Sequence, residues 1–184
     1  LGVGLSASSG FRVFVPLLAA SIAAKFGLLP LGPGFAWMGS TAALVAFSAA
    51  TVVEIAGYYI PVVDHVLDTI TTPASVIAGT LLTTSVLTPD LDPTLKGGLG
   101  IIVGGGSAGV IQAGTALTRA TSTVTTAGLG NPIVATIEHI FSVIGSILSI
   151  LMPLIIAGIA LLIIVLFLFF ITRYLKKKIP EVAK

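Results

Sequence analysis

The stretch "IFSVIGSILSILMPLIIAGIALLIIVLFLFFIT" (Ile140–Thr172) contains no charged residue. As one straight helix it would be about 50 Å long, well beyond the roughly 30 Å of hydrocarbon in a bilayer. Pro153 lacks a main-chain donor and kinks a helix interior, so we expect a break there. The predicted span therefore runs from about Met152 to Thr172. A shorter helix precedes it and starts after "GNP" (130–132), because proline suits a first helical turn.

The composition indicates that the whole chain, and not only this stretch, belongs to a membrane protein. Hydrophobic residues make up 55% of the sequence and charged residues 9%, whereas soluble domains carry about 25% charged residues. Three further uncharged stretches are long enough to cross a bilayer, namely 26–53, 69–89 and 97–118. The sequence therefore predicts an all-α polytopic membrane protein with about five transmembrane helices (four to six), plus two short interfacial or re-entrant helices.

Basic residues are concentrated at the C-terminal end. Residues 173–184 contain five basic residues and one acidic residue. Such a cluster directly after a span indicates the cytoplasmic side, where anionic membrane lipids attract it. We expect a single helical membrane domain over 1–172 and a basic cytoplasmic tail over 173–184. Few aromatic residues interleave with these charges, so no nucleic-acid partner is expected.

The remaining spans are predicted at 99–118, 73–87 and 35–59. The first span is less certain in its limits, because a window over 5–24 contains Arg12 and one over 13–31 contains Lys25. We prefer 5–24, since a lysine at a helix end can extend its ammonium group to the interface. Five spans then place Lys25 and Lys96 on the same side as the tail.

Arg12 would lie within the membrane, where charged residues pair and face the protein interior. Glu54 is the first candidate partner, and Asp64, Asp68 and Glu138 are the alternatives.

The segment "PVVDHVLDTITTP" (61–73) is too short to cross and is bracketed by prolines. Its apolar residues recur at helical spacing, which predicts a surface or re-entrant helix. "VVDHVLDTI" (62–70) aligns without a gap with "TIEHIFSVI" (136–144), and each acid-His pair leads into a span. This similarity indicates an internal repeat, as in many transporters, or a chance match between short apolar segments.

Small residues recur every fourth position in the span 99–118, and this stripe includes Gly104 and Gln112. The stripe predicts a close approach of a neighbouring helix. Alternatively, Gly104, Gly105 and Gly106 break the helix near mid-bilayer and free main-chain amides for a solute, with Gln112 about two turns away.

Several acidic and histidine side chains are candidates for cation binding or proton transfer. Asp64 and Asp68 share one helical face beside His65, and Glu138 with His139 forms a second acid-His pair. Carboxylates with imidazole can bind a cation or relay protons, although two like charges on a surface helix are also typical of a solvated face. Enzyme motifs are missing, so we expect no enzyme, no metal site and no cofactor.

Several motifs occur in a recognisable order: "GFR" followed by "PLL", then "FAWMGS", "VDHVLD" and "GNP". Together they resemble an uncharacterised bacterial integral-membrane family, domain of unknown function 4126, from Gly4 to about Leu168. The resemblance implies a location in the bacterial inner membrane but no substrate. It marks a set of residues: Gly10, Phe11, Arg12, Asp64, His65, Asp68 and Asn131-Pro132.

The leading functional hypothesis is a small transporter or channel, assembled as a homo-oligomer. Arg12 and Arg119 would attract an anionic solute or headgroup, with help from freed amides near the glycine-rich segments. The acid-His helices, with Asp64, His65, Asp68 and Glu138, would gate or couple to protons. The alternative is a non-catalytic accessory subunit of a larger membrane complex.

Overall fold

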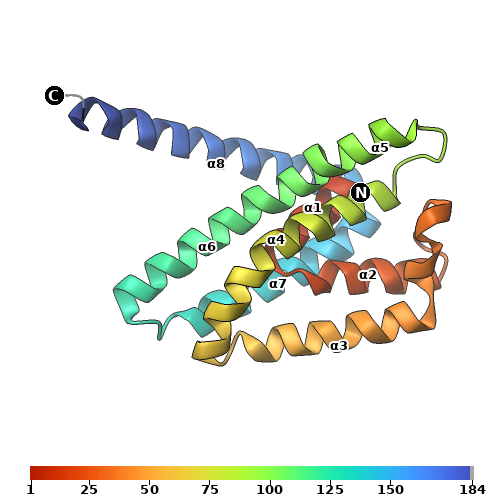
Figure 1. Ribbon diagram of the computed structural model, residues 1–184, viewed down its shortest axis with the longest axis horizontal. Coiled ribbons are helices and arrows are strands. Elements are labelled where there is room, and N and C mark those ends of the chain that lie inside the picture. The colour runs from red at the N-terminus through yellow and green to blue at the C-terminus, as the bar shows by residue number, and fades with distance from the viewer. Residues whose placement is uncertain (183–184) are drawn as a thin grey trace.

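The computed structural model describes the main chain of residues 1–182, and their side chains except those of residues 61, 62, 64, 65 and 175–182. Every regular element in this part of the chain is helical (Figure 1). The elements are, in chain order, α1 (Gly2–Phe11), α2 (Phe14–Lys25), the 3₁₀ helix η1 (Pro33–Gly39), α3 (Thr41–Gly57), α4 (Pro61–Ser85), α5 (Pro93–Leu99), the π-helix η2 (Gly100–Gly105), α6 (Gly106–Thr126), α7 (Asn131–Leu151) and α8 (Pro153–Val182). The predicted all-α fold is confirmed.

Four helical segments are long and apolar enough to span a bilayer: Val66–Ser85, Pro93–Thr126, Asn131–Leu151 and Pro153–Tyr174. The pair η1 and α3 would be a fifth span, with a bend of 63° between them. The number of spans agrees with the prediction of about five, but the set differs. Asn131–Leu151, expected as a shorter helix before the last span, is itself long enough to cross, whereas α1 and α2 are not. The expected break at Pro153 and the helix start at Asn131 are also confirmed.

The prediction of one continuous first span over 5–24 is wrong. The chain leaves helical geometry at Arg12, whose φ and ψ of −147° and 128° are those of extended backbone, and it resumes a helix at Phe14. Both outer ends lie beside the same end of α4, because Gly2 packs on Thr83 and the Gly32 amide donates to the Ser85 carbonyl at 2.8 Å. Helices α1 and α2 therefore form a hairpin with Arg12 at its tip.

Two other predicted breaks are absent from the described chain. Pro73 lies inside the continuous helix α4, so 61–73 is not a separate surface or re-entrant helix. The three glycines from Gly104 to Gly106 do not interrupt the Pro93–Thr126 helix, which passes through them as a π-turn followed by α6. A π-turn absorbs the local strain by widening the helix by one residue per turn, and the main-chain donors stay paired within the helix.

Lys25 and Lys96 lie at the end of the bundle where the α1–α2 hairpin is open, away from its tip at Arg12. The Lys96 ammonium group lies near Gly32 at this end. Helix α8 starts at this same end, where Gly4 contacts Ile156, and runs toward the opposite end while diverging from the bundle (Figure 1). Arg173 therefore lies at the other end from Lys25 and Lys96. The expectation that these two lysines share the side of the basic tail is not met by this arrangement.

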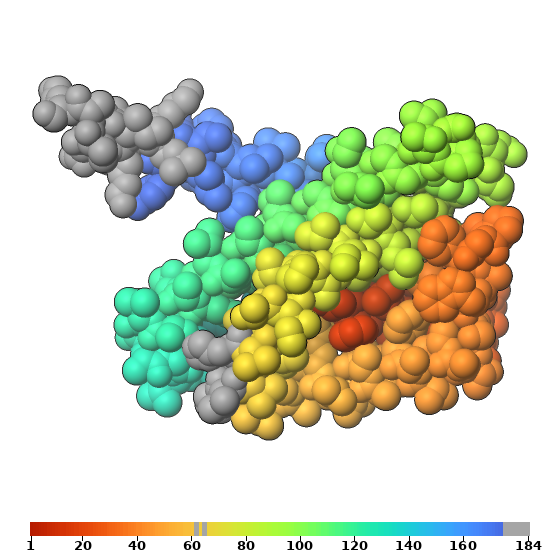
Figure 2. Space-filling view, viewed as in Figure 1, coloured from red at the N-terminus to blue at the C-terminus, as the bar shows by residue number. Residues whose placement is uncertain are grey.

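Many polar side chains face inward and many large apolar side chains face outward, unlike those of a soluble bundle. In α7 the buried face carries Asn131, Glu138, Ser142, Ser146 and Ser149, whereas its isoleucines from Ile133 to Ile147 are exposed. Helix α1 is enclosed between α4, α6 and α7, and in Figure 2 part of the red N-terminal hairpin is visible between the yellow and orange helices. Small buried residues allow this close packing, as they do in membrane helix interfaces generally.

Candidate functional site

The tip of the α1–α2 hairpin places Arg12 in the centre of the molecule. Its side chain is 1% exposed. The guanidinium donates from Nη2 to the Ala135 carbonyl at 3.1 Å and from Nε to His139 Nδ1 at 3.2 Å. The same Nη2 lies 2.9 Å from Glu138 Oε2. A single arginine at the hairpin tip thus holds α7 through three different groups.

Glu138 is shared by two arginines. Arg119 of α6 donates from Nε to both carboxylate oxygens, at 3.3 and 3.2 Å, and its Nη2 also contacts Oε2. Arg119 Nη1 reaches Asp68 Oδ1 of α4 at 3.1 Å. Arg119 and Glu138 are buried, whereas the Asp68 side chain is 31% exposed. The cluster therefore passes from a dry interior to a partly open edge at Asp68.

The Tyr58 ring lies against both arginines. The Cζ atoms of Arg12 and Arg119 are 3.6 and 4.1 Å from its centroid, within the range of favourable cation–π contacts. The Tyr58 hydroxyl pairs with Thr71 Oγ1 at 3.0 Å. Tyr58 directly follows α3, so the α3–α4 connection supplies an aromatic surface that holds two like charges side by side.

Glu54 is not the partner of Arg12, and this prediction is corrected to Glu138. The Glu54 carboxylate accepts hydrogen bonds from the main-chain amides of Val13 at 2.8 Å and Phe14 at 3.1 Å. These are orphan donors at the start of α2, where the helix dipole also favours a negative charge. Glu54 therefore stabilises the broken hairpin, because the second half-helix starts inside the protein rather than in water.

The glycines and Gln112 lie away from this cluster. A Cβ on Gly79 would be 2.6 Å from the Gly104 carbonyl, and Gly105 packs against Val76 and Thr80. Gly106 faces open space. Gln112 Nε2 approaches Thr72 Oγ1 at 3.5 Å. The close-approach interpretation of the small-residue stripe is confirmed, because Gly104, Gly105 and Gln112 contact α4.

Asp64 and His65 have side chains outside those that the structure describes, so their predicted role is not addressed. The other acid-His pair meets the arginines directly, and the His139 ring stacks on Tyr59 with centroids 6.3 Å apart. Among the described side chains, no three acidic or histidine groups come together in a way that could hold a metal ion.

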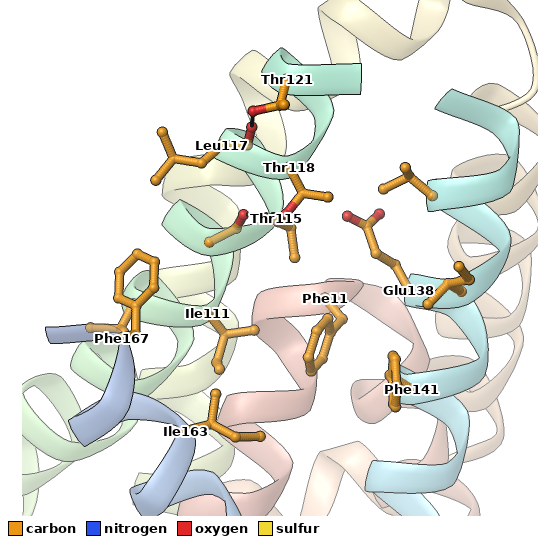
Figure 3. A pocket seen from close by; sticks show the side chains of 14 residues that line it. Phe11, Ile111, Thr115, Leu117, Thr118, Thr121, Glu138, Phe141, Ile163 and Phe167 are labelled. Atoms are coloured by element: carbon orange, nitrogen blue, oxygen red, sulfur yellow. Dashed lines mark hydrogen bonds between the residues drawn. The ribbon is translucent and has the colours of Figure 1, made fainter. Parts of the chain in front are cut away.

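An apolar groove with a volume of about 640 Å³ lies next to the cluster (Figure 3). It runs between α6, α7 and α8, and Phe11 closes it on the α1 side. Phe11 stacks on Phe141 with ring centroids 5.8 Å apart. Glu138 is the charged residue in its lining, and Figure 3 shows the Glu138 carboxylate facing the groove.

Residues 1–173 match the family model described as domain of unknown function (DUF4126). The chain belongs to this family. No curated protein and no solved structure matches the chain. Membership in this family therefore brings no activity with it, and the site must be interpreted from its own residues.

Tyr58 was not predicted as a member of the site, and Phe11 was named only as a residue that the family resemblance marks. The only sequence signal for Tyr58 is the pair "YY" (58–59) before Pro61, and tyrosines at the end of a span are ordinarily interfacial anchors. Phe11 stood next to Arg12 within a motif but carried no chemistry of its own. Both residues acquire a role only from the hairpin, which a periodicity argument cannot predict.

Proposed function

We propose that this protein is a small integral-membrane transporter for anionic solutes, in which Arg12 and Arg119 bind the anion in place of Glu138. The proposal depends on one observation: a single carboxylate bridges two buried arginines at the tip of a hairpin inside the bundle. A carboxylate in this position is an internal substitute for a ligand anion. When Glu138 turns away, the guanidinium hydrogens that contact it can bind a solute, while Arg12 keeps its bonds to Ala135 and His139 and Arg119 its contact with Asp68.

The charges support an anion rather than a cation. Arg12, Arg119 and Glu138 together carry one net positive charge in a region shielded from water. Asp68 at the open edge, 3.1 Å from Arg119, brings the formal charge of the four residues to zero. Glu54 is already engaged by two amides of α2. Because desolvated charges must be compensated, an anion that replaces Glu138 restores the same balance.

Access to the site determines how the transporter would work. Asp68 is the exposed member of the cluster, so a solute from water would meet Asp68 and Arg119 first. Glu138 and Arg12 lie deeper, at the hairpin tip. We propose that Glu138 and Asp68 act as the gate, by exchanging their arginine contacts with the solute. Broken helices that end within a membrane domain are a recurrent device for such sites.

The location and assembly are also proposed. The basic residues from Arg173 onward favour a bacterial inner membrane with the C-terminus in the cytoplasm. The apolar outer faces of α7 and α8 are exposed in the isolated chain. They favour contact with membrane lipids and with further copies of the chain in a homo-oligomer.

The test is anion efflux from vesicles that contain the purified protein. Wild-type protein should release a trapped anion from a panel of chloride, acetate and phosphate. Arg12→Ala should abolish this flux while the protein still inserts. Arg173→Ala is the matched control, because Arg173 is exposed near the end of α8, and its flux should equal that of the wild type. Equal flux in the Arg12→Ala variant would refute the role of this arginine.

A second candidate function is an accessory subunit of a larger membrane complex. The observation that favours it is the burial of the cluster, since Arg12 is 1% exposed and Glu138 is buried. A buried cluster of paired charges is also what a structural core can contain. Native mass spectrometry after gentle extraction distinguishes the two functions. Copies of this chain alone favour transport, and stoichiometric foreign subunits favour the accessory role.

A further inference from the structure

The groove beside Glu138 (Figure 3) provides a route to the cluster that does not pass through water. Its outer rim is formed by half-exposed apolar side chains such as Leu117, Ile137 and Phe141, at 55%, 48% and 55% exposure. These residues lie on the outward faces of α6 and α7, which would contact lipid. The groove therefore opens sideways into the hydrocarbon.

The walls of the groove select apolar groups. The hydroxyls of Thr115, Thr118 and Thr121 each donate to a carbonyl of their own helix, at 2.9, 3.0 and 2.8 Å. These hydroxyl protons are thus unavailable to a ligand. The remaining lining is aliphatic or aromatic except for Glu138. The volume of about 640 Å³ is within the range of about 300–1,000 Å³ for sites that bind small molecules.

The inner end of the groove has the opposite character. The Glu138 carboxylate that faces the groove is held by Arg12 and Arg119. Phe11 of the lining is the residue directly before Arg12. An occupant that fills the groove thus brings its inner end to the Glu138 carboxylate, and Arg12 and Arg119, which lie outside the lining, become accessible to it only when Glu138 moves away.

We infer that the ligand is an anionic amphiphile: a single apolar chain lies in the groove and its phosphate or carboxylate headgroup displaces Glu138 from Arg12 and Arg119. This inference rests on the proposed function and names the class of its substrate. The net positive charge of the Arg12–Glu138–Arg119 group complements such a headgroup. An apolar helix of a second copy would not pair with that charge, and a small inorganic anion would not fill the groove.

The experiment uses full-length protein in phosphatidylcholine nanodiscs with hexadecyl phosphate that carries a photoreactive diazirine on its chain. Labelled peptides should map to the groove around Ile111, Phe141 and Phe167. Unlabelled hexadecyl phosphate should compete, whereas hexadecyltrimethylammonium and inorganic phosphate at equal concentration should not. Equal competition by the cationic amphiphile would show binding without headgroup selection and would overturn the inference.

A matched pair of variants tests the groove itself. Gly114 faces the Phe167 ring across the groove, where a Cβ would be 3.6 Å from Phe167, so Gly114→Trp should fill the groove and reduce labelling at least fivefold. Ala113 is exposed and outside the lining, so Ala113→Trp should leave labelling unchanged. Arg12→Gln should reduce labelling as well. Unchanged labelling in Gly114→Trp, or cross-links to a second copy in place of the probe, would overturn the inference.

Flux measurements separate this inference from the proposed function. If chloride, acetate or phosphate crosses vesicles in an Arg12-dependent way but hexadecyl phosphate does not label the groove, the amphiphile is refuted and the anion transporter stands. If hexadecyl phosphate labels the groove selectively but neither it nor a small anion crosses the membrane, the site binds its ligand and the transport function is refuted.

Discussion

Arg12 Nη2 lies 2.9 Å from Glu138 Oε2, although four α-helices, α3 to α6, separate the α1–α2 hairpin from α7 along the chain. This contact closes the bundle, because it links the tip of the N-terminal hairpin to the first turns of α7. Breaking a buried pair by removing one partner leaves an uncompensated charge and costs about 3–5 kcal/mol. The contact therefore holds the hairpin tip against α7, and it is also the centre of the proposed site.

A double-mutant cycle measures the coupling free energy between Arg12 and Glu138. Arg12→Met and Glu138→Leu should each lower the free energy of unfolding in mixed micelles by about 3–5 kcal/mol. The double variant should lose less than the sum, with a coupling of about 1–3 kcal/mol. The corresponding cycle for Arg12 and Glu54 should give a smaller coupling. A larger value for Glu54 than for Glu138 would contradict the pairing that the structure shows.

Glu54 should act as a helix cap. Glu54→Gln removes the charge at the start of α2 and should cost about 1 kcal/mol, and Glu54→Ala should cost about 2 kcal/mol because both amides lose their acceptor. Hydrogen exchange at the Val13 and Phe14 amides should accelerate in both variants. Asp92→Ala removes the cap of α5, whose acceptor serves Thr94 and Leu95, and it should leave Val13 and Phe14 protected. Unchanged exchange in Glu54→Ala would refute the capping role.

The close approach of α4 and η2 predicts an asymmetric response among the glycines. Gly79→Ala places a methyl group 2.6 Å from the Gly104 carbonyl and should destabilise the protein by about 1–3 kcal/mol. Gly106 faces open space, so Gly106→Ala should be neutral or should stabilise by up to about 1 kcal/mol through helix propensity. Thermal unfolding in detergent gives both values. Equal loss in the two variants would argue against close packing at Gly79.

The hairpin makes a prediction about topology. Because the described chain contains no cysteine, single cysteines can be placed at the exposed positions Leu28, Leu95 and Leu129. An impermeant maleimide should label Leu28→Cys and Leu95→Cys from one side of the membrane and Leu129→Cys from the other. A tag in front of Leu1 should lie on the side of Leu28. A tag on the opposite side would restore a single crossing through Arg12.

Sequence patterns were sufficient for the helices whose limits depend on local chemistry. The uncharged stretch 140–172, the proline at 153 and "GNP" predicted where α7 and α8 begin, since proline acts on its own helix. The length of α7 was underestimated, because Asn131–Leu151 is long enough to span a bilayer. The hairpin was not predictable in this way, because its halves have the same apolar periodicity as one continuous span. The continuous helix is interrupted at Arg12 because a distant residue, Glu54, accepts hydrogen bonds from the main-chain amides at the start of α2.

The candidate site shows the same division. Arg12, Arg119, Asp68, Glu138 and His139 were selected as charged or titratable residues in apolar surroundings, and the structure brings them together. The first predicted partner of Arg12 was incorrect because Glu54, counted in helical turns from Pro61, was expected to lie deeper in the membrane than the other acidic residues. Tyr58 and the groove depend on the three-dimensional arrangement of four helices. Pro73 was overestimated as a helix boundary, since α4 accommodates it without ending.

The most direct test of the central claim is anion binding to the Glu138→Gln variant, measured as the shift in unfolding temperature in neutral detergent with chloride, acetate or phosphate. Glu138→Gln alone should unfold at a lower temperature than the wild type, because two buried arginines lose their shared carboxylate. At least one of these anions should bind the variant about tenfold more tightly than the wild type, and Arg12→Ala in the same chain should remove the gain. If no anion stabilises Glu138→Gln more than it stabilises the wild type, the arginines do not form an anion site.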